Sequence, residues 1–301
     1  MSVGKKLREL IARPGLLPIP GAYDAMSARI IEAEGFEAVG CGGGVTVGSL
    51  LAQPDTGQCN MRDYADNYAR ICAAVELPVL VDGDTGFGGP NNVRQMVRAF
   101  ETAGVAGLFF SDQTFPNRCA YHPGKSVIPV EEMLAKIKAA LDARRDGDLI
   151  IVARTDAAAV DGVDAAIERC QLFIEAGADI AKPQTLDAPE QIRRAIREIA
   201  GPHIVTLSQM AGKKHLGFAE LEALGVAAAT LPSLTMFAAV QSIRNALRGI
   251  KRDKSLASVD ADLIPLAEYY ELVGLGRQLA REKGYDEAAA AILNGRAAAR
   301  R

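Results

Sequence analysis

The sequence predicts a parallel (β/α)8 TIM barrel with additional C-terminal helices, and three observations lead to this fold class. Short apolar runs rich in Val, Ile and Leu alternate with longer amphipathic stretches that carry Glu, Arg and Ala. Gly35, Gly104, Gly177 and Gly225 each stand between an expected helix and an expected strand, where glycine can end the helix in the left-handed conformation. The length of 301 residues, 49% of them hydrophobic, suits one large core. The barrel is therefore favoured over a doubly wound open sheet.

Eight strand candidates share a short apolar run followed by polar residues: 16–23, 36–41, 77–84, 105–112, 149–156, 178–184, 203–209 and 226–232. Helices with an amphipathic pattern are expected between them, at 61–76, 91–104, 130–147, 164–177 and 189–199. From residue 235 the pattern is helical. We expect a single domain over residues 1–301, with a helical extension over about 235–301.

Composition and charge exclude several classes of protein. The net charge is -3, from 34 basic and 37 acidic residues spread along the chain, so no surface for nucleic acid is expected. No signal peptide and no membrane span are recognised, which predicts a cytoplasmic protein without a membrane partner. The five cysteines are odd in number and lack CxxC spacing, so reduced thiols are expected.

Polar residues are frequent where the strands end, and catalytic groups lie at that edge of a barrel. They are Asp82, Asp84, Ser111, Asp112, Arg154, Asp156, Lys182, Gln184, Ser208 and Gln209. Residues two apart on a strand face the same side, so the carboxylates of Asp82 and Asp84 are expected to converge and repel each other. A divalent cation resolves the repulsion, and Mg2+, or Mn2+ in its place, suits a site with few carboxylates. The alternative is a polar turn that caps the next helix.

The connection at 111–129 is long for a barrel loop, which is typical of lids and binding segments. Cys119 lies in it between Arg118 and His122, whose positive charge would activate the thiol as an acid or a nucleophile. An inert surface thiol is the alternative. Of the other histidines, His203 is expected to be structural, and the role of His215 stays open.

Four segments resemble one known family. The segments CGGGVTVGSLLAQPDTG, VLVDGDTGFGG, SDQTFPNRCAYHPGK and IIVARTDA, in this order and at these separations, resemble the isocitrate lyase and phosphoenolpyruvate mutase superfamily. The resemblance is to its methylisocitrate lyase-like branch, which includes enzymes that act on dimethylmalate and oxaloacetate, and it extends from about residue 16 to about 240. It implies a barrel whose eighth helix is exchanged between subunits, in a homodimer or a homotetramer.

The resemblance also implies a site and a reaction. Asp82 and Asp84 would hold Mg2+, with Asp55 as a further carboxylate, and Cys119 would protonate the departing carbanion. Arg154 would bind the substrate and its developing oxyanion, while the backbone of Gly42 and Gly43 would bind a substrate carboxylate. The implied reaction cleaves a carbon-carbon bond of a small 2-hydroxy di- or tricarboxylate, of the methylisocitrate or dimethylmalate kind, to a 2-oxo acid and a carboxylate.

This chain departs from the family pattern at several positions of the same site, namely Cys41, Ser111, Tyr121, Gln184 and Ser208. Two negative charges are lost, and Lys182 adds a positive one. A more electropositive pocket would suit a substrate with an additional carboxylate, or would weaken the hold on Mg2+. We therefore include Cys41, Lys182, Gln184 and Ser208 among the substrate-binding residues. Val39 replaces a tyrosine of the family's catalytic machinery, and Tyr23 and Tyr121 are candidates to replace it.

Three alternatives stay open. The chain could act on oxaloacetate as a decarboxylase or hydrolase, or be a phosphonate-type mutase or hydrolase of the same superfamily. It could be a barrel that has lost catalysis and binds a small molecule. Lys182 could form a Schiff base in a metal-independent aldolase or decarboxylase, or else extend its ammonium to solvent at the barrel rim.

Overall fold

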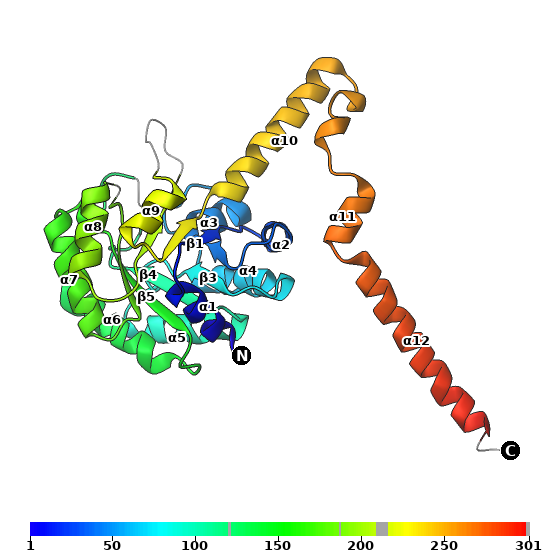
Figure 1. Cartoon of the computed structure of the whole chain (residues 1–301), viewed down its shortest axis with the longest axis horizontal. Coiled ribbons are helices and arrows are strands. Elements are labelled where there is room, and N and C mark those ends of the chain that lie inside the picture. The colour runs from blue at the N-terminus through cyan, green and yellow to red at the C-terminus, as the bar shows by residue number, and fades with distance from the viewer. Residues whose placement is uncertain (120–121, 187, 209–215, 299–301) are drawn as a thin grey trace. The chain divides into compact units, whose positions relative to one another are not determined.

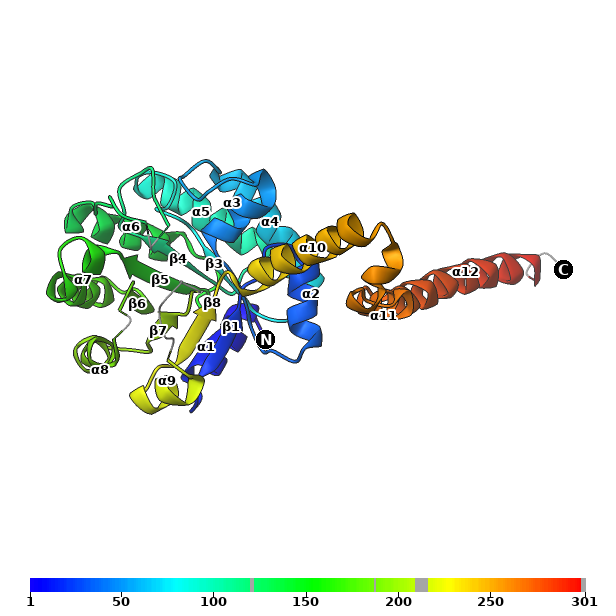
Figure 2. The same cartoon turned by 90° about the horizontal axis from the view of Figure 1, so that it is seen from above.

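The computed structural model describes the 301-residue chain except residues 120–121, 187, 209–215 and 299–301. Within the described residues, strands alternate with helices in the order that the sequence predicts, and Figures 1 and 2 show the strands inside a ring of helices. All the pairings between named strands are parallel. The predicted fold class, a (β/α)8 barrel with additional C-terminal helices, is confirmed.

The strands fall within the predicted runs and are short. They are β1 (Leu17–Pro20), β2 (Val39–Cys41), β3 (Val79–Asp82), β4 (Gly107–Ser111), β5 (Ile150–Thr155), β6 (Ile180–Pro183), β7 (Ile204–Thr206) and β8 (Ala228–Leu231). They pair as β1-β8-β7 and as β2-β3-β4-β5-β6. A parallel bridge between Gly21 and Gly40 continues the pairing from the end of β1 to β2.

The helices of the barrel surround these strands. They are α1 (Val3–Ala12), α2 (Ala25–Ala33), α3 (Gly43–Leu51), α4 (Met61–Ala74), α5 (Pro90–Ala103), α6 (Val130–Ala143), α7 (Val163–Glu175), α8 (Pro189–Glu198), α9 (Phe218–Leu224) and α10 (Leu234–Asp253), with a 3-10 turn η1 (Ala157–Ala159) after β5. The predicted glycine joins are confirmed, since Gly35, Gly104, Gly177 and Gly225 all have positive φ angles. No described helix is long and apolar enough to cross a membrane.

The core has two parts, on the two sides of the strands. The larger one packs helix faces against the outer side of the strands. The smaller one fills the barrel interior, where Leu7 and Ile11 of α1 pack against strand residues such as Ile19, Leu80 and Val152. α1 therefore contributes to the interior packing, and the cavity described below begins above Ile19 and Leu80.

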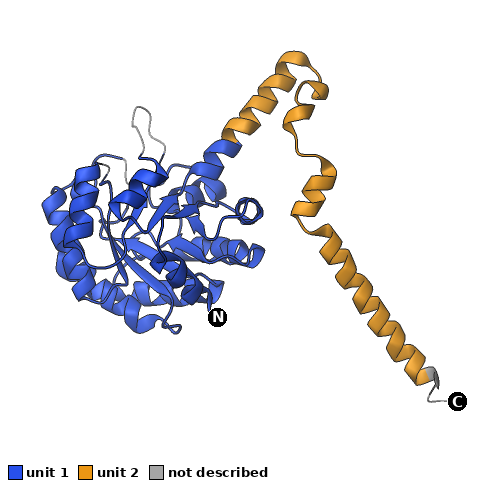
Figure 3. Cartoon of the chain, viewed as in Figure 1, with its two compact units in different colours: residues 1–239 blue, residues 240–301 orange. Residues whose placement is uncertain are grey.

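The chain separates into two compact units, residues 1–239 and 240–301 (Figure 3). The second unit is helical, as predicted, and contains the rest of α10, the turns η2 (Leu256–Ser258) and η3 (Asp260–Asp262), α11 (Leu266–Leu272) and α12 (Leu275–Ala298). It exposes many large apolar side chains, including Ile243, Leu247, Leu266 and Ile292. The assignment of the whole chain to one domain and the exchange of the eighth helix between subunits stay predictions.

Candidate active site

One cavity of about 460 Å³ lies at the carboxyl ends of the strands. All the residues that the sequence assigns to the site line it: Cys41, Gly42, Gly43, Asp55, Asp82, Asp84, Cys119, Arg154, Lys182, Gln184 and Ser208. They come from strands β2, β3, β5 and β6, from the start of helix α3 and from six connections, so the barrel brings together residues that lie up to 167 positions apart.

Asp55, Asp82 and Asp84, which we call the acidic wall, gather around the start of α3. Asp82 Oδ2 accepts a hydrogen bond from the backbone N–H of Gly43 at 3.0 Å, and its Oδ1 accepts one from the N–H of Asp84 at 2.9 Å. A Cβ atom added to Gly43 would lie 2.7 Å from Asp84 Oδ1 and 3.2 Å from Asp82 Oδ2. Only glycine at this position allows both carboxylates to approach the helix start.

Asp82 and Asp84 both line the cavity, as expected, but they do not lie on the same face of one strand, which was the reason for expecting it. β3 ends at Asp82, and Asp84 lies in the following turn with a left-handed φ of 48°. The backbone oxygen of Asp84 accepts from the N–H of Ser111 at 2.7 Å, and Asn117 Nδ2 donates to Asp84 Oδ1 at 3.2 Å. The turn after the strand, and not the strand face, therefore orients the second carboxylate.

In the protein without a bound cation, the ionised forms of the three carboxyl groups of the acidic wall are disfavoured. Burial raises the pKa of Asp82, against the lowering effects of Arg154 and of the N–H groups of Gly43 and Asp84. Burial and the charges of Asp82 and Asp55 raise the pKa of Asp84 well above its ordinary value. Burial and Asp82 raise the pKa of Asp55 to about 6. The positive charge of Arg154, which acts on all three carboxyl groups, is therefore outweighed by burial and by their mutual repulsion.

These residues fit a divalent cation. The Oδ1 atom of Asp55 is buried without a hydrogen-bond partner among the described residues. Carboxylate oxygens are the ligands that Mg2+ prefers, and Mg2+ usually keeps several water ligands. Among the described residues, no three His, Cys, Asp or Glu side chains are already placed as a ligand group for a metal ion.

Gly42 and Gly43, whose backbone is expected to bind a substrate carboxylate, lie at the start of a helix. Gly42 is the N-cap of α3, and Gly43 is its first residue. The N–H of Gly43 is already bonded to Asp82, so in this structure it holds the acidic wall and does not face a substrate carboxylate. The helix start still favours anions nearby through its dipole.

Cys41 and Cys119, which both line the cavity, differ in their surroundings. Cys41 is buried against the hydroxyl of Thr46, at 3.4 Å from Sγ to Oγ1, and burial raises its pKa to about 12, so it stays a neutral thiol. Cys119 is half-buried and lies in the connection after β4. Two hydrogen bonds hold the start of that connection, both at 3.0 Å: Gln113 Nε2 donates to the backbone oxygen of Arg118, and the backbone N–H of Arg118 donates to Gln113 Oε1.

Arg154 at the end of β5 is held by an ion pair, from its Nε to Asp156 Oδ2 at 2.9 Å. Lys125 from the Cys119 connection also reaches Asp156, at 3.7 Å from Nζ to Oδ1. Asp156 thus links the arginine to the connection that carries Cys119. Asp112, another strand-end residue, does not line the cavity, and instead accepts hydrogen bonds from Thr155 and from the backbone N–H of Asp156.

Lys182 of β6 lies next to Arg154 in the strand register. Its Nζ donates to Thr206 Oγ1 at 2.6 Å and lies 5.1 Å from the centre of the Phe109 ring. Burial, followed by the charge of Arg154, lowers its pKa to about 7. Only 4% of Lys182 is exposed, so the expectation of an ammonium that reaches solvent at the rim is wrong.

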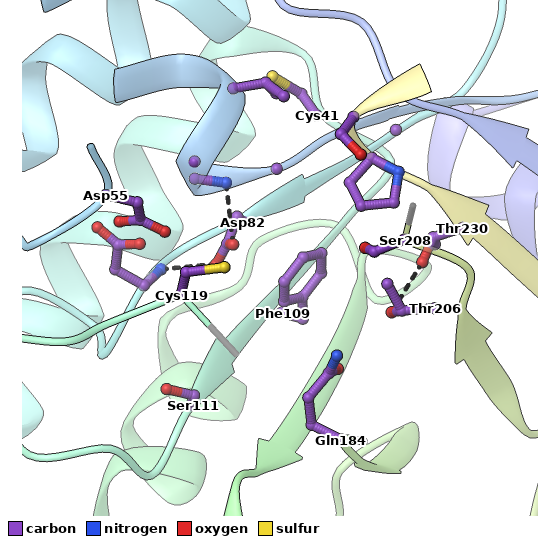
Figure 4. A pocket seen from close by; sticks show the side chains of 18 of the residues that line it. Cys41, Asp55, Asp82, Phe109, Ser111, Cys119, Gln184, Thr206, Ser208 and Thr230 are labelled. Carbon is purple, nitrogen blue, oxygen red and sulfur yellow. Dashed lines mark hydrogen bonds between the residues drawn. The ribbon is translucent and has the colours of Figure 1, made fainter. Parts of the chain in front are cut away.

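Several cavity residues were not identified from the sequence. Phe109, Asn117, Thr206 and Thr230 all line it. Thr206 ends β7, and Thr230 is the residue before the end of β8, so both lie where polar strand-end residues are expected. Figure 4 shows Asp55, Asp82 and Cys119 on one side of the Phe109 ring and the two threonines on the other.

The remaining residues that the sequence singles out have different outcomes. Tyr23, a candidate for the missing tyrosine, is not among the described residues that line the cavity, and Tyr121 and His215 fall outside the described residues. His203 is buried, with Nε2 at 3.1 Å from the backbone oxygen of Ile199, which confirms its expected structural role. Gln184 lines the cavity with its Oε1 buried and without a described partner.

Comparisons with known proteins agree with this geometry. Residues 7–251 match the model of the phosphoenolpyruvate phosphomutase family. The 2,3-dimethylmalate lyase of Eubacterium barkeri is 35% identical over 285 residues, which cover 95% of this chain and 99% of that enzyme.

Two solved structures share the fold over nearly the whole chain. Oxaloacetate acetylhydrolase in complex with the inhibitor 3,3-difluorooxalacetate superposes with a TM-score of 0.89 at 30% identity, covering 95% of this chain and 97% of that one. Phosphonopyruvate hydrolase in complex with oxalate and Mg2+ superposes with a TM-score of 0.85 at 29% identity, covering 95% and 99%. This chain therefore belongs to the phosphoenolpyruvate mutase and isocitrate lyase superfamily, and it is an enzyme of the carbon-carbon lyase class.

Proposed function

We propose that this protein is a Mg2+-dependent lyase that cleaves a carbon-carbon bond of a small 2-hydroxy di- or tricarboxylate, of the methylisocitrate or dimethylmalate kind. The products are a 2-oxo acid and a carboxylate. The observation that carries the proposal is that the carboxylates of buried Asp82 and Asp84 and of partly buried Asp55 line one cavity together with Cys119 and Arg154.

The acidic wall would hold Mg2+, or Mn2+ in its place, directly or through water. When bound, the cation would bind the 2-hydroxy acid end of the substrate and stabilise the negative charge that develops on the oxygen. Arg154 would contribute to the same stabilisation, because its guanidinium is buried and Asp156 fixes its orientation. Gln184 and Ser208 would position the rest of the substrate from the other strand ends.

In the proposed cleavage, the 2-hydroxyl group gives its proton to a base, its oxygen forms the carbonyl of the 2-oxo acid, and the adjacent carbon-carbon bond breaks. Its electron pair passes to the departing carbon, next to a carboxylate. The Cys119 thiol would donate a proton to that carbon, and the attachment of its connection through Gln113 and Lys125 supports a closed position over the cavity.

The same proposal covers assembly and location. The exposed apolar side chains of the second unit support a homodimer or homotetramer in which they are covered, with the eighth helix exchanged between subunits. All five cysteines are unpaired, which supports a reducing compartment such as the cytoplasm.

Hydrolysis or decarboxylation of oxaloacetate is the second candidate function. The likeness to oxaloacetate acetylhydrolase favours it, because the two chains superpose over 95% of this one. In that case the acidic wall would serve a 2-oxo acid as substrate in place of a 2-hydroxy acid.

The test is turnover of methylisocitrate, dimethylmalate, citramalate, malate and oxaloacetate, with Mg2+ and with EDTA, by wild type and Cys119→Ser. We expect formation of a 2-oxo acid that requires the metal and falls by about 10²- to 10⁴-fold in the variant, the range for loss of a general acid. Cys72→Ser, which removes a thiol from helix α4, is the matched control.

Each other outcome selects another function. Turnover of oxaloacetate alone would select the second candidate. Turnover that survives EDTA would reject the metal-dependent mechanism. Absence of turnover with every substrate would leave a binding barrel in place of the lyase.

A further inference from the structure

Lys182, Thr206 and Thr230, which we call the lysine wall, form a polar surface on one side of the cavity. The three residues come from adjacent strands, β6, β7 and β8. Ile19, Leu80 and Phe109 lie among the cavity-lining residues and provide the apolar surroundings. The lysine is nearly completely buried, so the protein carries the cost of removing an ammonium group from water here.

The hydroxyl groups of the wall are ordered in one direction. Thr230 Oγ1 donates to the backbone oxygen of Val205 at 3.2 Å, which leaves its oxygen to accept from Thr206 Oγ1 at 3.0 Å (Figure 4). Thr206 Oγ1 in turn accepts from Lys182 Nζ at 2.6 Å. The threonines thus fix the position of the amine without placing a hydroxyl proton against it.

The ammonium of Lys182 forms no ion pair among the described residues, although the charges of Asp82 and Asp156 act on it from farther away. No described carboxylate lies within ion-pair distance of its Nζ, and the neighbouring Arg154 is paired with Asp156. An ammonium has three N–H donors, and one is used by Thr206. The remaining donors suit an acceptor that carries negative charge, which would also favour the protonated form of the group.

We propose that the lysine wall is a subsite for a second carboxylate of the substrate, so that the site selects dicarboxylates over monocarboxylates with the same carbon skeleton. The inference rests on the proposed function, in which the acidic wall and its cation bind the 2-hydroxy acid end. The apolar surface of Phe109 then contacts the carbon skeleton between the two ends. Lys182 supplies the charge, and Thr206 and Thr230 act as positioning residues.

The experiment measures binding without turnover. Malate and 2-hydroxybutyrate share a four-carbon 2-hydroxy acid skeleton, and malate alone has a second carboxylate. Their dissociation constants are measured with Mg2+ by titration calorimetry, for wild type, Lys182→Met and Thr206→Val. NMR spectra of the ligands check that both stay intact. Lys138→Met is the matched control, because it removes one positive charge from the exposed face of α6.

Wild type should bind malate more tightly than 2-hydroxybutyrate. Lys182→Met should weaken malate binding by about 10- to 100-fold, the range for a charge-assisted hydrogen bond, and change 2-hydroxybutyrate binding by less than about 3-fold. Thr206→Val should give a smaller loss in the same direction, and it keeps the test decisive if Lys182→Met does not fold. Lys138→Met should leave both constants unchanged.

An equal loss for both ligands, or no preference in wild type, would overturn the subsite. A covalent adduct on Lys182 after borohydride treatment with pyruvate would also overturn it, because the lysine would then be a nucleophile. The two proposals fail separately. Malate preference that depends on Lys182, without turnover of any substrate, would keep the subsite and reject the lyase. Turnover without a malate preference that depends on Lys182 would keep the lyase and reject the subsite.

Discussion

The acidic wall and the lysine wall line the same cavity but depart from ordinary ionisation in opposite directions. Burial raises the pKa values of Asp55, Asp82 and Asp84, whereas it lowers that of Lys182. In both walls the charged form is disfavoured because water is excluded and no nearby counter-charge fully replaces it. This difference is the one that the two proposals require, since they assign a cation to the acidic wall and a carboxylate of the substrate to the lysine wall.

Removal of a charge from the acidic wall should have the largest effect on catalysis. Asp82→Asn keeps the size of the side chain but removes the charge of a carboxylate held by the N–H groups of Gly43 and Asp84. We expect kcat/KM to fall by about 10²- to 10³-fold, the range for loss of electrostatic stabilisation of a transition state. Steady-state kinetics over a series of Mg2+ concentrations measures it.

Asp66→Asn, in α4, is the control for this variant, since Asp66 pairs with an exposed arginine of its own helix, Arg62. Unchanged kinetics in Asp82→Asn would show that the acidic wall does not take part in the reaction.

The burial of Lys182 should make the stability of the folded protein depend on pH. The pKa of Lys182 is about 7 in the folded protein, against an ordinary value of 10.5. The unfolded state therefore binds more protons between these values, and this group's contribution to stability is lost as pH falls from 10 to 7. We expect the stability of wild type relative to Lys182→Met to fall by about 1.4 kcal/mol per pH unit over that interval. Urea unfolding without ligand, at pH 7, 8, 9 and 10, measures the difference.

Lys5→Met, which removes an exposed lysine of α1, is the control. A stability difference between wild type and Lys182→Met that does not change with pH would mean that the buried amine keeps its ordinary pKa.

Replacing one carboxylate of the acidic wall with a neutral side chain should make the metal-free protein more stable. Asp84→Asn removes the repulsion with Asp82 and Asp55 that raises the pKa of this residue. A gain of about 1 kcal/mol would raise Tm by about 2–4 °C in a chain of this size. Mg2+ should raise the Tm of wild type and have less effect on the variant, because a ligand stabilises only the state that binds it. A lower Tm of the metal-free variant would contradict the assignment of repulsion to this wall.

The smallest effect is expected at the far end of the lysine wall. Thr230→Val keeps the shape of the side chain and removes the acceptor for the hydroxyl of Thr206. Because Lys182 keeps its direct partner, the preference for malate over 2-hydroxybutyrate should fall by only about 2- to 5-fold, the range for a net neutral hydrogen bond. Calorimetry of the two ligands measures it. A loss as large as that of Lys182→Met would show that Thr230 contacts the ligand itself.

Much of the fold was predictable because its signals are local. Apolar runs ended by polar residues predicted the strands, and the glycines at positions 35, 104, 177 and 225 predicted where helices end. The site residues were also predictable in kind, because polar groups at the carboxyl ends of barrel strands share one cavity. The helix that begins at Gly43 was not predicted, since three consecutive glycines indicate a loop.

The sequence by itself determined which residues meet: a barrel places every strand end at one edge, so Asp82, Cys119, Arg154 and Lys182 had to line the same cavity. The tertiary structure alone decided how they are charged and held. The left-handed turn at Asp84, the N–H of Gly43 on Asp82 and the burial of Lys182 against Thr206 depend on contacts between distant segments. Burial and hydrogen bonding set the pKa of a group, and both arise only when the chain is packed.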